Sequence, residues 1–274
     1  NTVLGNTVNG RTGTVGLRPS HGRVPAFNGT ARGERQLSLQ LVSVQGAITR
    51  TVADARLAFE TMIRPDPRDP LHIPLPAAGA EPLARRVAVS YDPAGAGLHP
   101  TVRDAVTQAA RQLAAAGYVV EAVDPPDVAE AAEAWNRFAQ GETRLTLWET
   151  VQALGDAGSR RAMALMLQRT PTLDVAALMA VTASRATLLR RWQLFLDRYP
   201  LVLCPVAQEP ALPYGVDLDS EASVDRLYRS HTWLFATAFL GLPSIAVPTG
   251  IAGGLPMGVQ LIGPRFREDA VLDA

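Results

Sequence analysis

The sequence predicts an α/β protein whose mixed β-sheet is covered by helices on both faces. Apolar strands and helices of polar and apolar residues alternate along most of the chain, a pattern typical of this class. The predicted strands are continuously apolar, as in LVLCPV at 201–206, which indicates a sheet buried on both faces. A strand, helix and strand between residues 86 and 123 indicate a parallel crossover.

The first predicted helix spans residues 51–62, TVADARLAFETM. Thr51 is followed three residues later by Asp54, which is the spacing of a capping box with Asp as the shorter variant. Apolar residues then recur at helical spacing, and the prolines of DPRDP end the helix. The Pro- and Gly-rich segment 65–82 is the only candidate linker. No repeats are visible, so residues 1–274 are predicted to form a single domain.

The central part of the chain predicts a run of strands and helices. A strand at 86–90 is followed by a helix at 101–116, which Gly117 ends. Further elements are expected in chain order: a strand at 118–123, helices at 128–154, 159–168 and 173–199, and a strand at 201–206. The acidic run from Asp217 to Asp225 is predicted to be a solvated surface loop.

A segment without charged residues, 231–264, requires a check for membrane insertion. Prolines and glycines break it into pieces shorter than the roughly 20 apolar residues that a spanning helix needs. A short helix at 233–239 and two buried strands at 244–247 and 258–262 are predicted instead. No membrane partner is expected.

Composition fits an ordinary soluble globular protein, with 47% hydrophobic and 19% charged residues and no net charge. Zero net charge gives no electrostatic argument for nucleic acid or an anionic membrane. Cys204 is the only cysteine, so no internal disulfide can form and a cytoplasmic location is the default. All 26 basic residues are arginine. Chemistry that needs a lysine therefore requires residues outside this sequence.

Metal and phosphate sites find little support in the sequence. The four histidines, His21, His72, His99 and His231, are scattered without paired ligand spacing, so no metal and no cofactor are predicted. Gly95 and Gly97 follow a strand and precede a helix, but a third glycine and a P-loop lysine are missing. They are predicted to form a turn. The alternative of an unrelated nucleotide-binding α/β protein is not supported, because the sequence shows no phosphate site. Cys204, inside an apolar strand, is predicted to be an inert buried thiol.

Ser20 and His21 are neighbours in the loop sequence TGTVGLRPSHGRVP, which raises the question of a nucleophile beside its base. Adjacent side chains in an extended or turn segment point in different directions. The base of a catalytic triad normally comes from elsewhere in the fold. Ser20 is therefore predicted to bond local backbone in a turn, and no catalytic residue is assigned.

Several segments resemble motifs of the amidase signature hydrolases. GLRPSHGRV at 16–24 is similar to the family's GLKPT-x-GRV segment, and GAITRTVAD at 46–54 is similar to its GPLARTVAD segment. The closing segments also resemble the family: GLPSIAVPTG at 241–250, GLPMGVQLIG at 254–263 and RFRED at 265–269. The resemblance covers nearly the whole chain and is weakest from 74 to 193.

The resemblance implies an amidase that hydrolyses a carboxamide to an acid and ammonia or an amine. In this family a serine attacks the carbonyl, a second serine relays its proton, a lysine is the base, and backbone N–H groups form the oxyanion hole. The nucleophile is expected near Leu4, but no serine precedes Ser20. The lysine and the relay serine belong further upstream. Asn1 at the start and VLDA at the end predict a domain truncated at both ends, and this chain is expected to be inactive.

Two readings of function stay open. The first is an amidase of Ser-Ser-Lys chemistry that acts on a small-molecule amide, with a homodimer as an allowed assembly. The second is a non-catalytic homologue that keeps the fold for binding or as a scaffold. For substrate binding, Trp135 and Phe138 stand three residues apart and share one helix face. They are the candidate pocket residues, with core packing as the alternative.

Overall fold

The computed structural model describes residues 13–30, 33–79 and 81–274, and their centre is a seven-stranded sheet. The strands are β1 (Val15–Arg18), β2 (Ile48–Thr49), β3 (Arg86–Val89), β4 (Val119–Ala122), β5 (Leu201–Pro205), β6 (Ser244–Ala252) and β7 (Leu255–Ile262). They lie in the order β2-β1-β6-β7-β5-β3-β4. β3 pairs in parallel with β4 and β5, while the other pairs are antiparallel. The predicted mixed sheet and its parallel crossover are confirmed.

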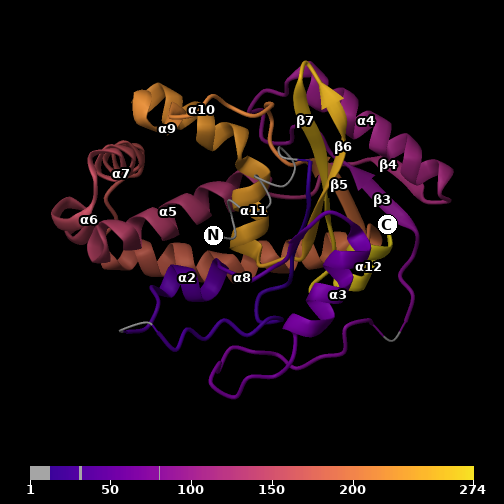
Figure 1. The fold of residues 1–274 in the computed structure, drawn as a ribbon, viewed down its shortest axis with the longest axis horizontal. Helices are drawn as coiled ribbons and strands as arrows, with labels where there is room; N and C mark the ends of the chain where they lie inside the picture. Colours follow the sequence, from indigo (N-terminus) through magenta and orange to yellow (C-terminus); the bar gives the residue numbers. More distant parts are fainter. Residues whose placement is uncertain (1–12, 31–32, 80) are drawn as a thin grey trace.

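Successive strand residues point to opposite faces of the sheet, and both faces are buried. Leu201 and Leu203 join an apolar cluster with α3 (Val52–Met62), α4 (Pro100–Ala115) and α12 (Glu268–Asp273). Val202 and Cys204 join a second cluster on the other face, with α2 (Leu37–Val42), α5 (Val128–Thr146), α8 (Val175–Arg198) and α11 (Thr232–Leu240). Figure 1 shows α4 on one side of the sheet and the long helices α5 and α8 on the other.

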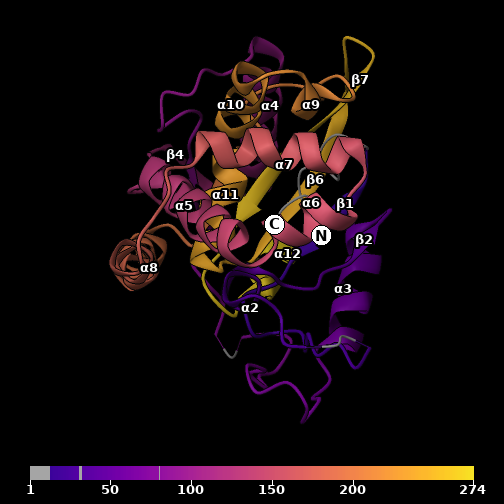
Figure 2. The ribbon, with the colours of Figure 1, turned by 90° about the vertical axis from the view of Figure 1, so that its left-hand side faces the viewer.

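The remaining helices are α6 (Trp148–Leu154), α7 (Ala157–Arg169), α9 (Val216–Asp219) and α10 (Glu221–Ser230). In Figure 1 the view runs along α7 and α8 lies across it, whereas in Figure 2 the view runs along α8 and α7 lies across it. The two helices are therefore roughly perpendicular. α10 leads directly into α11, which packs against α5 between the outer helices and the sheet.

Helix boundaries follow local hydrogen bonds. Thr51 Oγ accepts from the backbone N–H of Asp54, which confirms the predicted helix start. The helix predicted at 128–154 is two helices, because the chain bends at Leu147. The hydroxyl of Thr146 donates to the Glu142 carbonyl, a bond of the kind that bends helices.

The acidic segment 217–225 is helical, so its prediction as a loop is wrong. Ser220 begins α10 by accepting from the N–H of Ser223. Val224 and Tyr228 are buried four residues apart on one face, which is the helical period. An acidic residue in the first turn of a helix is favoured by the helix dipole. Glu221 in the first turn of α10 therefore stabilises this helix.

The two C-terminal strands are longer than predicted. β6 and β7 form a hairpin whose turn contains Gly253 and Gly254, with φ of +58° and +79°. Positive φ at consecutive turn residues matches the twist of a tight hairpin and favours glycine. Over the residues that the structure describes, no helix is long and apolar enough to cross a membrane.

Candidate functional site

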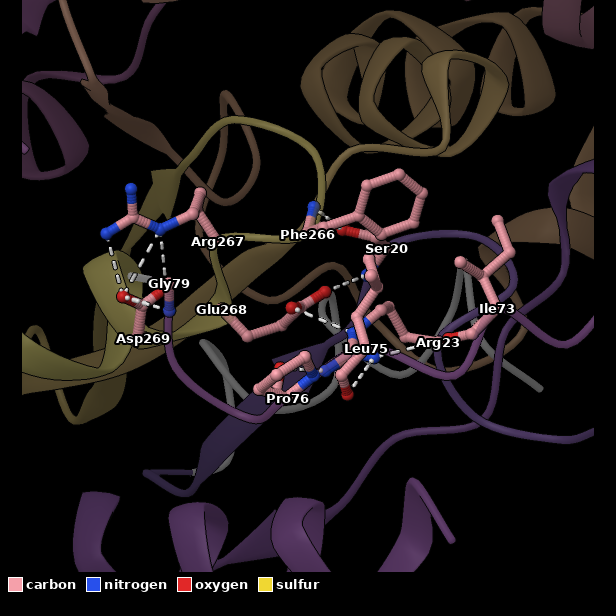
Figure 3. A network of polar contacts seen from close by, with 10 residues as sticks. All are labelled: Ser20, Arg23, Ile73, Leu75, Pro76, Gly79, Phe266, Arg267, Glu268 and Asp269. Carbon is pink, nitrogen blue, oxygen red and sulfur yellow. Dashed lines mark hydrogen bonds and ion pairs between the residues drawn. The ribbon is translucent and has the colours of Figure 1, made fainter. Parts of the chain in front are cut away.

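Ser20 and His21 do not form a nucleophile and base pair. The fully buried Ser20 hydroxyl accepts a hydrogen bond of 2.7 Å from the backbone N–H of Phe266. His21 Nε2 lies 2.6 Å from the carbonyl of Gln40. Each side chain therefore has its own backbone partner. The predicted bond of Ser20 to local backbone is wrong, because its partner Phe266 lies 246 residues along the chain (Figure 3).

A buried ion pair joins the two motifs at opposite ends of the sequence. Glu268 accepts from the backbone N–H of Ser20 at 2.7 Å and from Arg23 Nε at 3.4 Å, and neither charged side chain is exposed. The guanidinium of Arg23 also donates to three carbonyls in the predicted linker, those of Ile73, Leu75 and Pro76. Figure 3 shows this convergence. Ser20, Arg23 and Glu268 thus hold three chain segments together.

The other weak candidates from the sequence also have structural partners. The backbone N–H groups of Ala96 and Gly97 donate to the carboxylate of Asp92, which makes Gly95–Gly97 a turn, as predicted. Cys204 is fully buried, and burial raises the pKa of its thiol. Among the residues described, no group of three or more His, Cys, Asp and Glu side chains could hold a metal ion. The position near Leu4, where the nucleophile was expected, lies outside the described residues.

The structure places Trp135 and Phe138 on the side of α5 that faces α11. Trp135 is partly buried and stacks on Phe235, with ring centroids 4.3 Å apart and an interplanar angle of 17°. Phe138 is only 1% exposed and meets Phe239 edge-on, with ring centroids 6.3 Å apart. Trp135 therefore lies nearer the surface, and Phe138 packs behind it in the core.

An aromatic layer extends from Trp135 across α11 to α10. Phe235 stacks on Trp135 and also contacts the rings of Tyr228, at 5.0 Å, and His231, at 6.2 Å. We call Trp135, Tyr228, His231 and Phe235 the aromatic layer. The proximity of Tyr228, His231 and Phe235 to Trp135 could not be predicted from the sequence, because these residues lie far from Trp135 along the chain. The only available signal was the i, i+4 spacing of His231 and Phe235 and the position of Tyr228 one turn earlier.

A cavity of about 170 Å³ lies against this layer. Its lining includes Phe235, Tyr228 and Thr232 from the α10–α11 segment and Asn136 from α5. Asn136 is buried, and its Oδ1 accepts from the Thr170 hydroxyl at 3.2 Å. Its Nδ2 has no hydrogen-bond partner in the described part of the chain. A buried amide N–H without a partner is costly. The cavity therefore offers an aromatic wall and an available donor.

Burial favours the neutral form of Tyr228 on this side of the cavity. Burial raises the pKa of Tyr228 to about 12, although the charge of Arg169 and a hydrogen bond from Gln140 lower it. Arg169 lies 4.6 Å from the centre of the Tyr228 ring and pairs with Asp225 and Glu133. The geometry suits a flat apolar group that carries a hydrogen-bond acceptor.

Comparison with known proteins defines the family. The amidase family model matches residues 10–272. Indoleacetamide hydrolase from Bradyrhizobium japonicum is 37% identical over 264 residues, which cover 96% of this chain and 57% of that protein. An indoleacetamide hydrolase from Bradyrhizobium diazoefficiens is 36% identical, with 96% of this chain and 50% of that protein covered. The chain belongs to the amidase signature family.

Solved structures show the same fold. A bacterial aryl acylamidase of the amidase signature family matches with a TM-score of 0.72 and 24% identity, over 97% of this chain and 57% of that one. The 6-aminohexanoate cyclic dimer hydrolase complexed with substrate matches with a TM-score of 0.73 and 20% identity, over 96% and 59%. The chain spans 50–57% of the length of the two indoleacetamide hydrolases.

Proposed function

We propose that this chain is part of an amidase that hydrolyses an aromatic carboxamide to the acid and ammonia. Family membership and the similarity to indoleacetamide hydrolases support the reaction type. The aromatic layer beside the cavity is the observation that carries the substrate class. A flat ring gains apolar burial and favourable ring contacts against Phe235, and Asn136 Nδ2 can donate to an oxygen of the same ligand.

The proposed chemistry uses two serines and a lysine that lie outside these 274 residues. Three observations support this proposal. The sequence contains no lysine, no serine precedes Ser20, and the hydroxyl of Ser20 is buried with a backbone partner. A serine hydroxyl without a base is a poor nucleophile, so the chain alone is expected to be inactive.

Trp135 and Phe138 remain the proposed substrate-binding residues, but each would affect the substrate in a different way. Trp135 would fix the ring plane of Phe235 by stacking on it, and thereby shape the cavity wall. Phe138, which lies in the core behind, would act on a substrate only through the position of α11. A cytoplasmic location and a homodimer stay predictions as well.

The substrate class can be tested by calorimetric titration of the chain with indole-3-acetamide and with acetamide. Indole-3-acetamide is expected to bind with measurable heat, and Phe235→Leu should weaken it about threefold to tenfold because an aromatic contact is lost. Phe195→Leu is the matched control, since Phe195 stacks on Tyr199 instead. Equal weakening by both substitutions, or equal affinity for both amides, would count against the aromatic cavity.

The catalytic half of the proposal needs a separate experiment. Intact-mass spectrometry after treatment with a fluorophosphonate is expected to show no adduct on this chain. A longer polypeptide that contains it and hydrolyses amides should form one adduct N-terminal to Thr12. If a folded longer polypeptide showed no adduct at any pH, the binding or scaffold alternative would be preferred. Amide turnover by the chain alone that Ser20→Ala abolishes would contradict the structural role of Ser20.

A further inference from the structure

Four basic side chains converge at the C-terminal end of α11. Arg18 ends β1, His21 lies in the following loop, Arg185 is in α8, and Arg265 follows β7. We call these residues the basic cluster. Arg18 Nη2 lies 3.4 Å from the carbonyl of Ala238 and 2.9 Å from that of Val42. Arg185 Nε donates to the carbonyl of the next residue in α11, Phe239, at 2.5 Å.

Two members of the cluster, His21 and Arg185, are packed closely around Gly241. The backbone N–H of His21 donates to the Gly241 carbonyl at 3.1 Å. A Cβ atom placed on Gly241 would lie 2.6 Å from Arg185 Nη2 and 3.0 Å from His21 Cβ. The φ of +67° at Gly241 also favours glycine. The loop that contains His21 and the guanidinium of Arg185 therefore lie on either side of Gly241, where no side chain would fit.

No carboxylate balances these charges within the described part of the chain. Arg18, Arg185 and Arg265 form no ion pair there, and the nearby Glu268 is bound to Arg23 and Ser20. Arg18 is only 3% exposed, and its Nε and Nη1 have no hydrogen-bond partner among the residues that the structure describes. Buried guanidinium donors without partners are costly. The cluster thus has both excess charge and unused donors.

The pKa values reflect the same imbalance. Burial, followed by the charge of Arg185, lowers the pKa of Arg18 to about 9. Burial, followed by the charge of Arg265, lowers that of Arg185 to about 10. The pKa of His21 is lowered by burial and by all three arginines, against the effect of its bond to Gln40. These groups face His21 from β1, α8 and the segment after β7, and none of them is acidic.

Capping of a helix by cations explains only part of this arrangement. Cations are favoured at the C-terminus of a helix, which accounts for the bonds to Ala238 and Phe239. It leaves Arg18 Nε and Nη1 unused, and it gives no reason for Arg265 and His21 to be present. An anion with two or more oxygens satisfies such donors, because the planar guanidinium binds carboxylate and phosphate through two parallel bonds.

We propose that the basic cluster is a binding site for an oxyanion, either a carboxylate or a phosphate group. The site does not depend on the proposed amidase function. α11 has nine residues and is therefore about 13 Å long, with the aromatic layer at its N-terminal half and the basic cluster at its C-terminal end. Loss of amide binding would leave the oxyanion site unaffected.

Thermal unfolding at constant ionic strength tests the proposal. Sodium phosphate at pH 7.5 is expected to raise the Tm of the chain, relative to sodium chloride, by roughly 3 °C or more at a tenfold excess over Kd, and the rise should saturate. Arg185→Gln and Arg265→Gln should each reduce this rise. Arg190→Gln is the matched control, because Arg190 is exposed on the same helix as Arg185. A parallel titration with acetate distinguishes a preference for phosphate from one for carboxylate.

A second readout uses the unmodified chain and does not depend on whether the variants fold. His21 Nε2 faces a carbonyl, so it carries a proton and the ring titrates at Nδ1. A bound anion favours the charged imidazole. NMR titration should therefore show the pKa of His21 rising when phosphate replaces chloride. An unchanged pKa at His21, or a Tm rise that persists in both arginine variants, would overturn the proposal and leave the arginines as helix caps.

Discussion

At the scale of single residues, the protein handles buried arginine in two different ways. Arg23 meets a carboxylate and three carbonyls, so its charge is paired and its donors are used. Arg18 meets only carbonyls and keeps unused donors. Both residues belong to one motif, GLRPSHGR, and this motif predicted the loop that contains them. The sequence could not show which arginine would be paired, since Glu268 is 245 residues from Arg23.

Removing one partner of the buried pair should be costly. Glu268→Gln is expected to lower the free energy of unfolding by about 3–5 kcal/mol, because the charge of Arg23 would stay buried without its counter-ion. Asp273→Asn provides a control in the same helix: its pair with Arg56 is exposed and should contribute no more than about 1 kcal/mol. Urea unfolding measures both values. Similar losses would show that Arg23 is sufficiently stabilised by the three carbonyls.

His21 should make stability depend on pH in a defined window. Burial is the main cause of its lowered pKa. As the pH falls through 6.5, the unfolded chain binds a proton that the folded chain does not yet bind, so stability present above this pH is lost. The slope is at most about 1.4 kcal/mol per pH unit.

Urea unfolding between pH 8 and 5.5, in chloride without phosphate, measures this dependence. His21→Gln should flatten the profile, because an amide does not titrate and can still donate to Gln40. A slope that is the same in this variant and in the unmodified chain would assign the pH dependence to other groups.

At the scale of elements, the sequence predicted a helix start correctly where the residues that cap the helix lie within one turn of each other. Thr51 and Asp54 predicted the start of α3 because both partners of the cap stand within one turn. The failure at α10 has the same origin: the acidic residues outweighed the i, i+4 pair of Val224 and Tyr228. The burial that makes this segment a helix comes in part from α5 and α7, which lie far from it in the sequence.

Gly46 should be the least replaceable residue of the GAITRTVAD motif at the β1–β2 pair. A Cβ atom on Gly46 would lie 2.0 Å from the carbonyl oxygen of Leu17, a contact that requires backbone movement. The N–H of Leu17 also donates a hydrogen bond to the carbonyl of Ala47 here. Gly46→Ala is therefore expected to cost about 1–3 kcal/mol or more. At Gly33, where no atom lies within 4 Å, alanine should change stability by less than about 1 kcal/mol. Chemical denaturation of both variants provides the comparison.

At the scale of the whole molecule, the sheet separates two apolar layers, and the strands β3, β5 and β7 contribute to both. Continuously apolar strands predicted this arrangement correctly, since a strand such as β5 needs cover on both faces. The aromatic layer and the basic cluster could not be predicted in the same way. Each combines residues from separate helices and loops, such as Arg18 with Arg185, and no spacing in the sequence records that proximity.

If the chain is the single domain that we predict, it should unfold in one cooperative transition. Trp135, Trp148, Trp192 and Trp233 lie on α5, α6, α8 and α11, so their fluorescence reports on the helices of one side only. Leu113 on α4 is buried in the layer on the opposite face. Leu113→Ala should cost about 2–5 kcal/mol. If the layers unfold together through their shared strands, this substitution lowers the urea midpoint of tryptophan fluorescence as much as that of far-UV circular dichroism.

The matched comparison uses two leucines of α8. Leu196 is buried in the cluster that contains Trp192 and Trp233, so Leu196→Ala should shift both midpoints, as Leu113→Ala does. Leu194 is 67% exposed, and Leu194→Ala should shift neither. A loss confined to circular dichroism in Leu113→Ala, with the fluorescence midpoint unchanged, would mean that the α4 side unfolds by itself. The two apolar layers would then be independently unfolding units. A loss of packing in one layer lowers the stability of the other only if both unfold together with the strands that they share.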